Sequence, residues 1–154
     1  MDRIELRGPA ERTLHGMLEW RARRQPDAPW VWFRERVISY GELDAEADRV
    51  AAGLAALGVS RGTKVAVMMA NRPEFLAAWF GLSKLGAVEV PLNTAHRGYL
   101  LSYLLRQADC EALIVEGAYA ERLSQALASD AEAVPRLRRI VVLDGDPSGL
   151  DLPG

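Results

Sequence analysis

Hydrophobic residues in the middle of the chain alternate between short unbroken runs and helical spacing. Residues 65–69 form an apolar run rich in Val and Met, which is typical of a strand buried on both faces. Pro73 then stands where a first helical residue would, and apolar residues follow at helical spacing. Gly86 can adopt the left-handed conformation that ends a helix. Residues 87–90 are expected to form a second strand ended by Pro91, so this stretch predicts a strand, a helix and a parallel strand.

The chain before this stretch predicts a short helix and a hairpin. Thr13 can cap a helix, because apolar residues follow it at helical spacing. Residues 30–38 predict a hairpin whose turn lies at the charged residues 34–36. Trp30 and Trp32 are two residues apart and therefore share one strand face. We expect both to pack onto a core rather than to form a platform for stacking bases.

A longer helix is predicted to follow the hairpin. Ser39 and Glu42 have the spacing of a capping box, in which each side chain accepts a hydrogen bond from the other residue's backbone amide. The helix then extends to Gly58, which can end it. Its apolar side is predicted to consist of Leu43, Ala47, Val50, Leu54 and Leu57.

The alternation of strands and helices continues after Asn93. A helix is predicted from about Arg97, with its apolar face marked by Leu100, Tyr103, Leu104 and Gln107. A strand at 112–115, a helix at 119–127 and a last strand at 140–143 follow.

This regular alternation predicts an α/β fold with an open, mostly parallel sheet, helices on both faces, and a short N-terminal hairpin. Residues 1–12 show no periodic spacing of hydrophobic residues and are expected to be a flexible lead-in. Residues 13–143 are expected to form one α/β subdomain. Residues 144–154 are rich in Gly, Pro and Asp and read as a linker-like tail.

Composition narrows the classes of function. The chain has 154 residues, 49% of them hydrophobic and 26% charged, which suits one globular core. A net charge of −2 gives no general attraction for phosphate backbones, so we expect no nucleic-acid partner. No apolar run approaches the roughly 20 residues of a membrane span, and no segment resembles a signal peptide. A cytoplasmic location is therefore expected.

Several chemistries lack the residues that they need. Cys110 has carboxylates on both sides in the sequence, which disfavour a reactive thiolate, so we expect it to be inert. His15 and His96 are too far apart in the sequence to suggest a metal site. Ser83 lacks the closing glycine of a nucleophile elbow, and no glycine-rich turn for a dinucleotide follows residues 65–69.

Two sequence blocks resemble known motifs. Residues 38–43 read ISYGEL and resemble the motif "L-T-Y-x-E-L". Residues 84–93 read KLGAVEVPLN and resemble "K-x-G-A-x-x-x-P-L-N". Both motifs belong to the AMP-forming adenylating enzymes, the superfamily of acyl-CoA synthetases, adenylation domains and luciferases, which this chain therefore resembles. The match runs in order over about residues 12–144, and residues 91–93 favour acyl-CoA and aryl-CoA ligases over peptide synthetase modules. The motif residues to which we assign structural roles are Ser39, Tyr40, Glu42, Lys84, Gly86 and Pro91.

The resemblance implies the first subdomain of a two-step ligase. Such an enzyme joins a carboxylic acid to ATP with Mg²⁺, giving an acyl-adenylate, and a thiol of coenzyme A or of a carrier protein then displaces AMP. The phosphate loop and the catalytic lysine of the family have no counterpart here. We therefore expect this chain to be about the first quarter of a ligase, without catalytic residues, inactive alone and without bound cofactor, with the remainder of the ligase chain as its partner.

Ligand contacts in open α/β sheets lie beyond the carboxyl ends of the strands, which here indicates Asn71, Arg72, Asn93 and Thr94. Capping of the helix at Pro73 is the favoured alternative for Asn71, with Arg72 as the other candidate cap. For Arg122, a position on a solvated helix face is favoured over a contact with a phosphate of coenzyme A.

A second hypothesis stays open. A truncated relative of such an enzyme could act as a stand-alone interaction module that uses an uncovered sheet face. In either case an uncovered apolar face predicts self-association.

Overall fold

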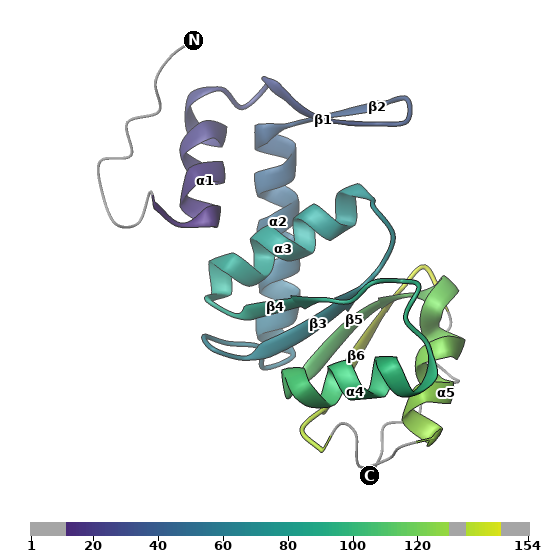
Figure 1. Ribbon diagram of the computed structural model, residues 1–154. Coiled ribbons are helices and arrows are strands. Elements are labelled where there is room, and N and C mark those ends of the chain that lie inside the picture. Colours follow the sequence, from purple (N-terminus) through teal and green to yellow (C-terminus); the bar gives the residue numbers. More distant parts are fainter. Residues whose placement is uncertain (1–11, 130–134, 146–154) are drawn as a thin grey trace. The chain divides into compact units, whose positions relative to one another are not determined.

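A computed structural model describes residues 12–129 and 135–145 (Figure 1). The chain forms two compact units. One comprises residues up to 58 together with 72–86 and is called the helical unit below; the other comprises residues 59–71 and those from 87 onward and is called the sheet unit. The predicted lead-in at 1–12 and tail at 144–154 lie almost entirely outside the described residues.

The helical unit contains three helices and a hairpin. Its elements are α1 (Leu14–Arg24), β1 (Pro29–Phe33), β2 (Arg36–Ser39), α2 (Tyr40–Ala56) and α3 (Pro73–Leu85). The strands β1 and β2 pair in antiparallel fashion, as the hairpin prediction requires. The close approach of α3 to α2 depends on Gly81, because a Cβ at this position would lie 3.0 Å from the carbonyl oxygen of Ala47.

Three predicted helix ends of this unit are confirmed, namely the starts of α1 and α2 and the end of α3. The Ser39 amide donates to Glu42 Oε2 over 2.8 Å, and the Glu42 amide donates to Ser39 Oγ over 3.2 Å, which completes the capping box. Thr13 Oγ1 accepts a hydrogen bond from the Gly16 amide at the start of α1. Gly86 ends α3 with a φ of 67°, the left-handed conformation expected of a glycine there.

The core of the helical unit lies between its helices and the hairpin. Its buried members are Leu18, Ile38, Leu43, Ala47, Ala77 and Phe80. Trp30 packs beside this core and stacks on Tyr40 with ring centroids 4.8 Å apart. Of the residues predicted for the apolar side of α2, Leu57 is exposed. Ala51, which was not among them, is buried.

The expectation that Trp32 packs onto a core is wrong. Its side chain is 67% exposed, and its cross-strand partner Val37 is exposed as well. The pairing register shifts between Pro29 and Val31, so Trp30 occupies a bulge. A bulge reorients the side chain that it carries, so residues two apart no longer share one environment.

The described part of the sheet unit contains four strands, two helices and a 3₁₀ turn. Its elements are β3 (Lys64–Met68), β4 (Val88–Pro91), α4 (Gly98–Ala108), β5 (Ala112–Glu116), the 3₁₀ turn η2 (Gly117–Tyr119), α5 (Ala120–Ser129) and β6 (Arg139–Leu143). The strand order is β4-β3-β5-β6, and every pairing is parallel. The predicted α/β fold with a parallel sheet flanked by helices is therefore confirmed.

Helices α4 and α5 pack on one face of this sheet (Figure 1). The core there combines Ala66 and Met68 of β3 with Leu113 and Val115 of β5, and the helices contribute Leu101, Leu105, Leu123, Ala126 and Leu127. The face predicted for α4 is thus wrong. Leu101 and Leu105 are buried, whereas Leu100 and Tyr103 are exposed.

Candidate functional site

The carboxyl ends of β3 and β4 form the edge of the sheet unit where ligand contacts were predicted. The two strands are parallel neighbours, and the Leu92 amide donates to the Val67 carbonyl over 2.8 Å. Asn71 follows the first strand, and Asn93 and Thr94 follow the second. Asn71 and Asn93 are exposed, whereas Thr94 is half-buried. Three of the four predicted contact residues thus belong to this edge, and their role toward a ligand stays a prediction.

Asn93 and Thr94 are held by hydrogen bonds within the sheet unit. Asn93 Oδ1 accepts from the Ala95 amide over 2.8 Å, so the side chain closes its own turn. The Thr94 carbonyl accepts a hydrogen bond from the guanidinium of Arg122. This guanidinium also lies 5.4 Å from the ring centroid of Tyr119. The solvated position favoured for Arg122 is therefore wrong, because its side chain is half-buried and holds the loop after β4.

Glu116 contributes to the same edge and was not singled out in the sequence. Its Oε2 accepts a hydrogen bond of 2.8 Å from the Ala70 amide, across 46 residues of sequence. This contact joins the end of β5 to the loop after β3, which is its neighbour in the sheet. A carboxylate directly after the apolar run 112–115 was the available signal, but its partner is a backbone amide that no pattern of side chains reveals.

Arg72 belongs to the helical unit, where it forms the N-cap of α3. The preference for Asn71 as the cap is therefore wrong. Arg72 makes no side-chain cap, and its Nε instead lies 2.7 Å from Glu74 Oε2. That hydrogen bond lowers the pKa of Glu74 below its ordinary value.

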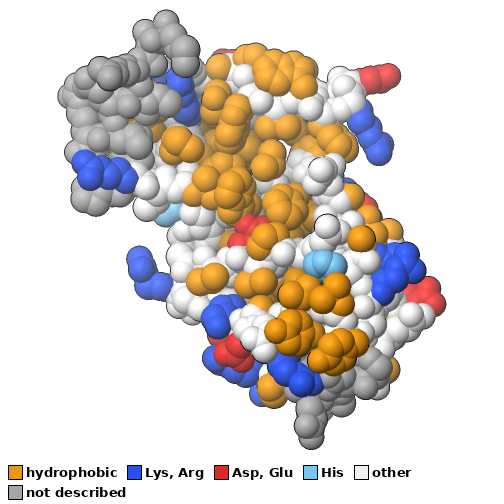
Figure 2. Space-filling model, viewed as in Figure 1, with side chains coloured by type: hydrophobic (Ala, Val, Ile, Leu, Met, Phe, Trp, Pro, Cys, Tyr) orange, Lys and Arg blue, Asp and Glu red, His pale blue; other side chains and the backbone are white. Residues whose placement is uncertain are grey.

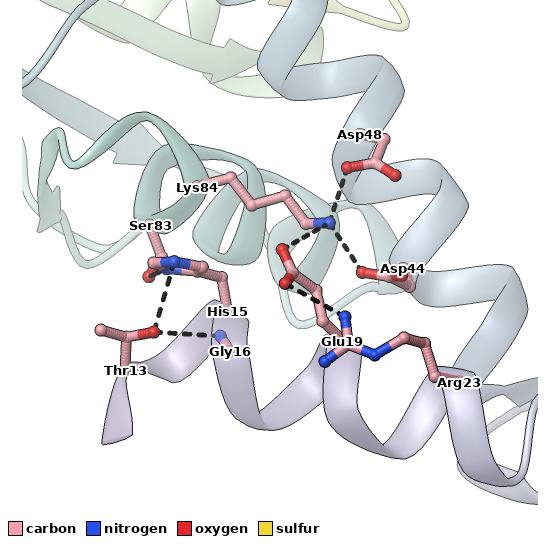
Figure 3. A network of polar contacts seen from close by, with 9 residues as sticks. All are labelled: Thr13, His15, Gly16, Glu19, Arg23, Asp44, Asp48, Ser83 and Lys84. Carbon is pink, nitrogen blue, oxygen red and sulfur yellow. Dashed lines mark hydrogen bonds and ion pairs between the residues drawn. The ribbon is translucent and has the colours of Figure 1, made fainter. Parts of the chain in front are cut away.

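Lys84 forms the most highly connected ionic cluster of the helical unit (Figure 3). Its Nζ lies 2.6 Å from Asp48, 2.7 Å from Asp44 and 3.4 Å from Glu19. Burial by itself would lower the pKa of Lys84, but the hydrogen bonds that it donates to Asp44 and Asp48 outweigh this effect and raise the pKa. A lysine held in this way stays charged and is bound to the scaffold, which agrees with the structural role assigned to it.

A second set of contacts lies beside this cluster and joins α1 to α3 (Figure 3). His15 Nδ1 is 3.0 Å from Ser83 Oγ, and His15 Nε2 is 3.3 Å from Thr13 Oγ1. These contacts show His15 in a hydrogen-bonded position between two helices. In the part of the chain that the structure describes, no three His, Cys, Asp or Glu side chains are grouped as a metal ion would require.

The helical unit also carries a cavity of about 460 Å³. Its lining consists of Arg36, Ile38, Glu42, Leu43, Ala45, Glu46, Arg49, Pro73 and Glu74. Most of its charged side chains already have a hydrogen-bond or ion-pair partner: Glu74 pairs with Arg72, Arg49 pairs with Glu46, and Glu42 caps α2. The cavity is therefore a polar depression in which most of the charged groups already have partners.

Two buried polar atoms of the sheet unit have no hydrogen-bond partner among the described residues, Glu89 Oε1 and His96 Nδ1. Burial raises the pKa of Glu89 to about 7. Burial also raises the pKa of Cys110 to about 11, which agrees with the expectation of an inert thiol. Glu89 was missed in the sequence, although a lone carboxylate between Val88 and Val90 was a visible signal.

The comparisons with known proteins agree on one family. A family model described as AMP-binding enzyme matches residues 18–153. The chain is 37% identical over 113 residues to phosphinothricin tripeptide synthetase PhsC of Streptomyces viridochromogenes, covering 73% of this chain and 10% of that protein. It is 31% identical to long-chain fatty acid transport protein 6 of Mus musculus, covering 98% of this chain and 24% of that protein.

Solved structures agree with these relatives. The crystal structure of the anthranilate CoA ligase AuaEII in complex with anthranoyl-AMP superposes with a TM-score of 0.79 at 26% sequence identity. The superposition covers 91% of this chain and 26% of that one. The chain thus spans about a quarter or less of the length of these proteins.

Proposed function

Because this chain belongs to the family of AMP-binding enzymes, we propose that it forms the first part of the N-terminal domain of an acid-thiol ligase. The observation that carries the proposal is the match of the family model to residues 18–153, on a parallel sheet that the AuaEII ligase shares. The residues of the two family motifs hold this scaffold together, through the capping box at Ser39 and the ionic cluster at Lys84.

The proposed reaction has two steps. An oxygen of the carboxylic acid attacks the α-phosphorus of ATP, which gives an acyl-adenylate and releases pyrophosphate. A thiol then attacks the acyl carbon, which gives a thioester and releases AMP. The anthranoyl-AMP in the AuaEII complex is an adenylate of the kind that the first step produces.

We propose that the part of this chain near the sheet edge shapes the site rather than performs chemistry. Asn93, Thr94 and Glu116 each make a hydrogen bond within the sheet unit, and Arg122 holds the loop after β4. Lys84, one of only two lysines, is bound to three carboxylates. The described residues do not by themselves fit a magnesium site, so ATP and Mg²⁺ are assigned to contacts with other parts of a longer ligase.

The acceptor thiol is proposed to be coenzyme A. The segment at 91–93 and the similarity to a CoA ligase support this choice. The similarity to PhsC, a tripeptide synthetase, supports the alternative of a carrier-protein thiol. An assay of the longer protein with both acceptors distinguishes the two.

Carboxylate-dependent exchange of pyrophosphate into ATP tests the proposal. The assay compares the 154-residue chain with the longer product of any reading frame that continues past Gly154, on a panel of aliphatic and aromatic acids. We expect exchange with the longer protein and none above background with the 154 residues. Exchange by the shorter chain would overturn the scaffold role, and no exchange by the longer protein would overturn the ligase.

The second candidate, a stand-alone interaction module, is favoured by the exposed large hydrophobic side chains of both units, including Trp32 and Tyr99. A stop codon directly after Gly154 would favour this candidate. A continuing frame that encodes a glycine-rich phosphate loop and a distal lysine would favour the ligase.

A further inference from the structure

Helix α4 exposes an apolar surface on the side facing away from its core contacts. Tyr99 is 78% exposed, Leu100 48% and Tyr103 43%, and these three residues are called the tyrosine face below. The two tyrosine rings stack on each other with centroids 6.2 Å apart. In Figure 2, hydrophobic side chains are exposed over the region where α4 lies in Figure 1.

The orientation of the tyrosine face is fixed by the opposite side of the same helix. Leu101 and Leu105 are fully buried against the sheet core, and Ser102 is buried between them. The helix therefore cannot rotate to cover Tyr99 and Tyr103 without exposing its core leucines, a change that the hydrophobic effect opposes.

The surroundings of the tyrosine face carry positive charge. No Asp or Glu occurs between Glu89 and Asp109, although the whole chain has a net charge of −2. Arg97 and Arg106 lie at the two ends of α4, and both are exposed. Asp109, which follows α4, pairs with Arg136, and Glu121 on α5 accepts a hydrogen bond from Gln125.

We propose that the tyrosine face of α4 is a contact surface for an anionic lipid membrane. Tyrosine suits the boundary between headgroups and acyl chains, because its ring is apolar and its hydroxyl remains hydrated. Arginines beside such residues attract anionic headgroups, and a helix with this pattern lies in the plane of the interface. In the described part of the chain, no helix is long and apolar enough to cross a membrane.

Charge favours a lipid surface over a second copy of this chain as the occupant. Two copies joined through their tyrosine faces would bring Arg97 and Arg106 of one chain close to those of the other, and like charges repel at such a contact. An anionic membrane has the complementary charge. The inference does not rest on the proposed ligase reaction.

Cosedimentation of the 154-residue chain with vesicles tests the inference. One set consists of phosphatidylcholine, and the other contains about one quarter phosphatidylglycerol. We expect binding to the anionic vesicles that weakens as salt is added, and little binding to phosphatidylcholine alone. The double variant Tyr99→Ser/Tyr103→Ser should lower the partition coefficient about tenfold, and Arg97→Gln should lower it about threefold.

The matched control is Trp32→Ser, which removes an equally exposed aromatic side chain from the helical unit. It should bind vesicles like the unchanged chain, and circular dichroism should show that all variants remain folded. Binding that is unaffected by the tyrosine substitutions, or lost equally in the control, would overturn the inference. A concentration-dependent dimer that these substitutions dissociate would assign the face to a second copy instead.

Discussion

The ammonium group of Lys84 lies 2.7 Å from the carboxylate of Asp44, and this contact joins the last turn of α3 to the first turns of α2. Asp48 and Glu19 complete the cluster, so one side chain links all three helices of the helical unit. The side chain of Lys84 is only 11% exposed and that of Asp44 is 21% exposed, so the contact between these two is largely shielded from solvent. Lys84, a residue of the family motif, thus makes these contacts within the helical unit.

Replacement of Lys84 by methionine should destabilise the chain. The change keeps most of the apolar stem but leaves Asp44 and Asp48 facing each other without a cation. We expect a loss of about 2 kcal/mol in the free energy of unfolding, below the range for a fully buried pair because Asp48 is largely exposed. Urea denaturation followed by circular dichroism measures it. The control Arg49→Gln breaks an exposed pair with Glu46 and should cost less than about 0.5 kcal/mol. Equal effects of the two substitutions would contradict the assigned role.

The glycine that ends α3 should be sensitive to substitution, unlike a glycine inside a helix. Gly86 has a φ of 67°, so Gly86→Ala should lower the free energy of unfolding by about 1 kcal/mol. Gly53 lies within α2, and a Cβ there would meet nothing within 4 Å. Gly53→Ala should therefore raise stability by about 0.5–1 kcal/mol. Two substitutions of the same kind should thus change the urea midpoint in opposite directions.

The buried carboxyl of Glu89 should make stability depend on pH. Burial raises its pKa from 4.5 to about 7, so the folded chain binds a proton that the unfolded chain has lost between these values. The stability contributed by the protonated carboxyl is complete below pH 4.5 and is lost as the pH rises through about 7. Glu89→Gln keeps the shape of the protonated group but cannot ionise.

We therefore expect Glu89→Gln to be more stable than the unchanged chain at about pH 8, by roughly 1–2 kcal/mol once partial exposure is allowed for. The two proteins should differ little at about pH 4.5. Urea titrations across this range measure the difference. A constant difference at all pH values would show that Glu89 does not titrate in this window.

Cys110 should be unreactive in the folded chain. Its side chain is buried, and its pKa is raised to about 11, so very little thiolate exists near neutral pH. An aromatic disulfide reagent should modify it slowly in buffer and rapidly in concentrated urea. Rapid modification of the folded chain would show that the sheet unit opens around β5 far more often than its packing suggests.

The signals that predicted the fold correctly were local ones. The capping box at Ser39 and Glu42 and the left-handed Gly86 depend on residues within a few positions of each other. The apolar runs at β3 and β5 needed only the rule that strands buried on both faces contain continuous apolar residues. These interactions act over one or two turns of chain, so the sequence alone was sufficient to predict the elements. The parallel direction of the strands followed from their alternation with helices, whereas their order in the sheet was not predicted.

The tertiary structure alone decided which faces of those elements are buried. Leucines at 100, 101, 104 and 105 extend around much of α4, so only packing against the sheet selected Leu101 and Leu105 and left Tyr99 and Tyr103 exposed. The hydrogen bond between Glu116 and Ala70, and the three carboxylates around Lys84, likewise join residues far apart in the chain. Burial and pairing depend on distances in space, and a local pattern of residue types does not contain those distances.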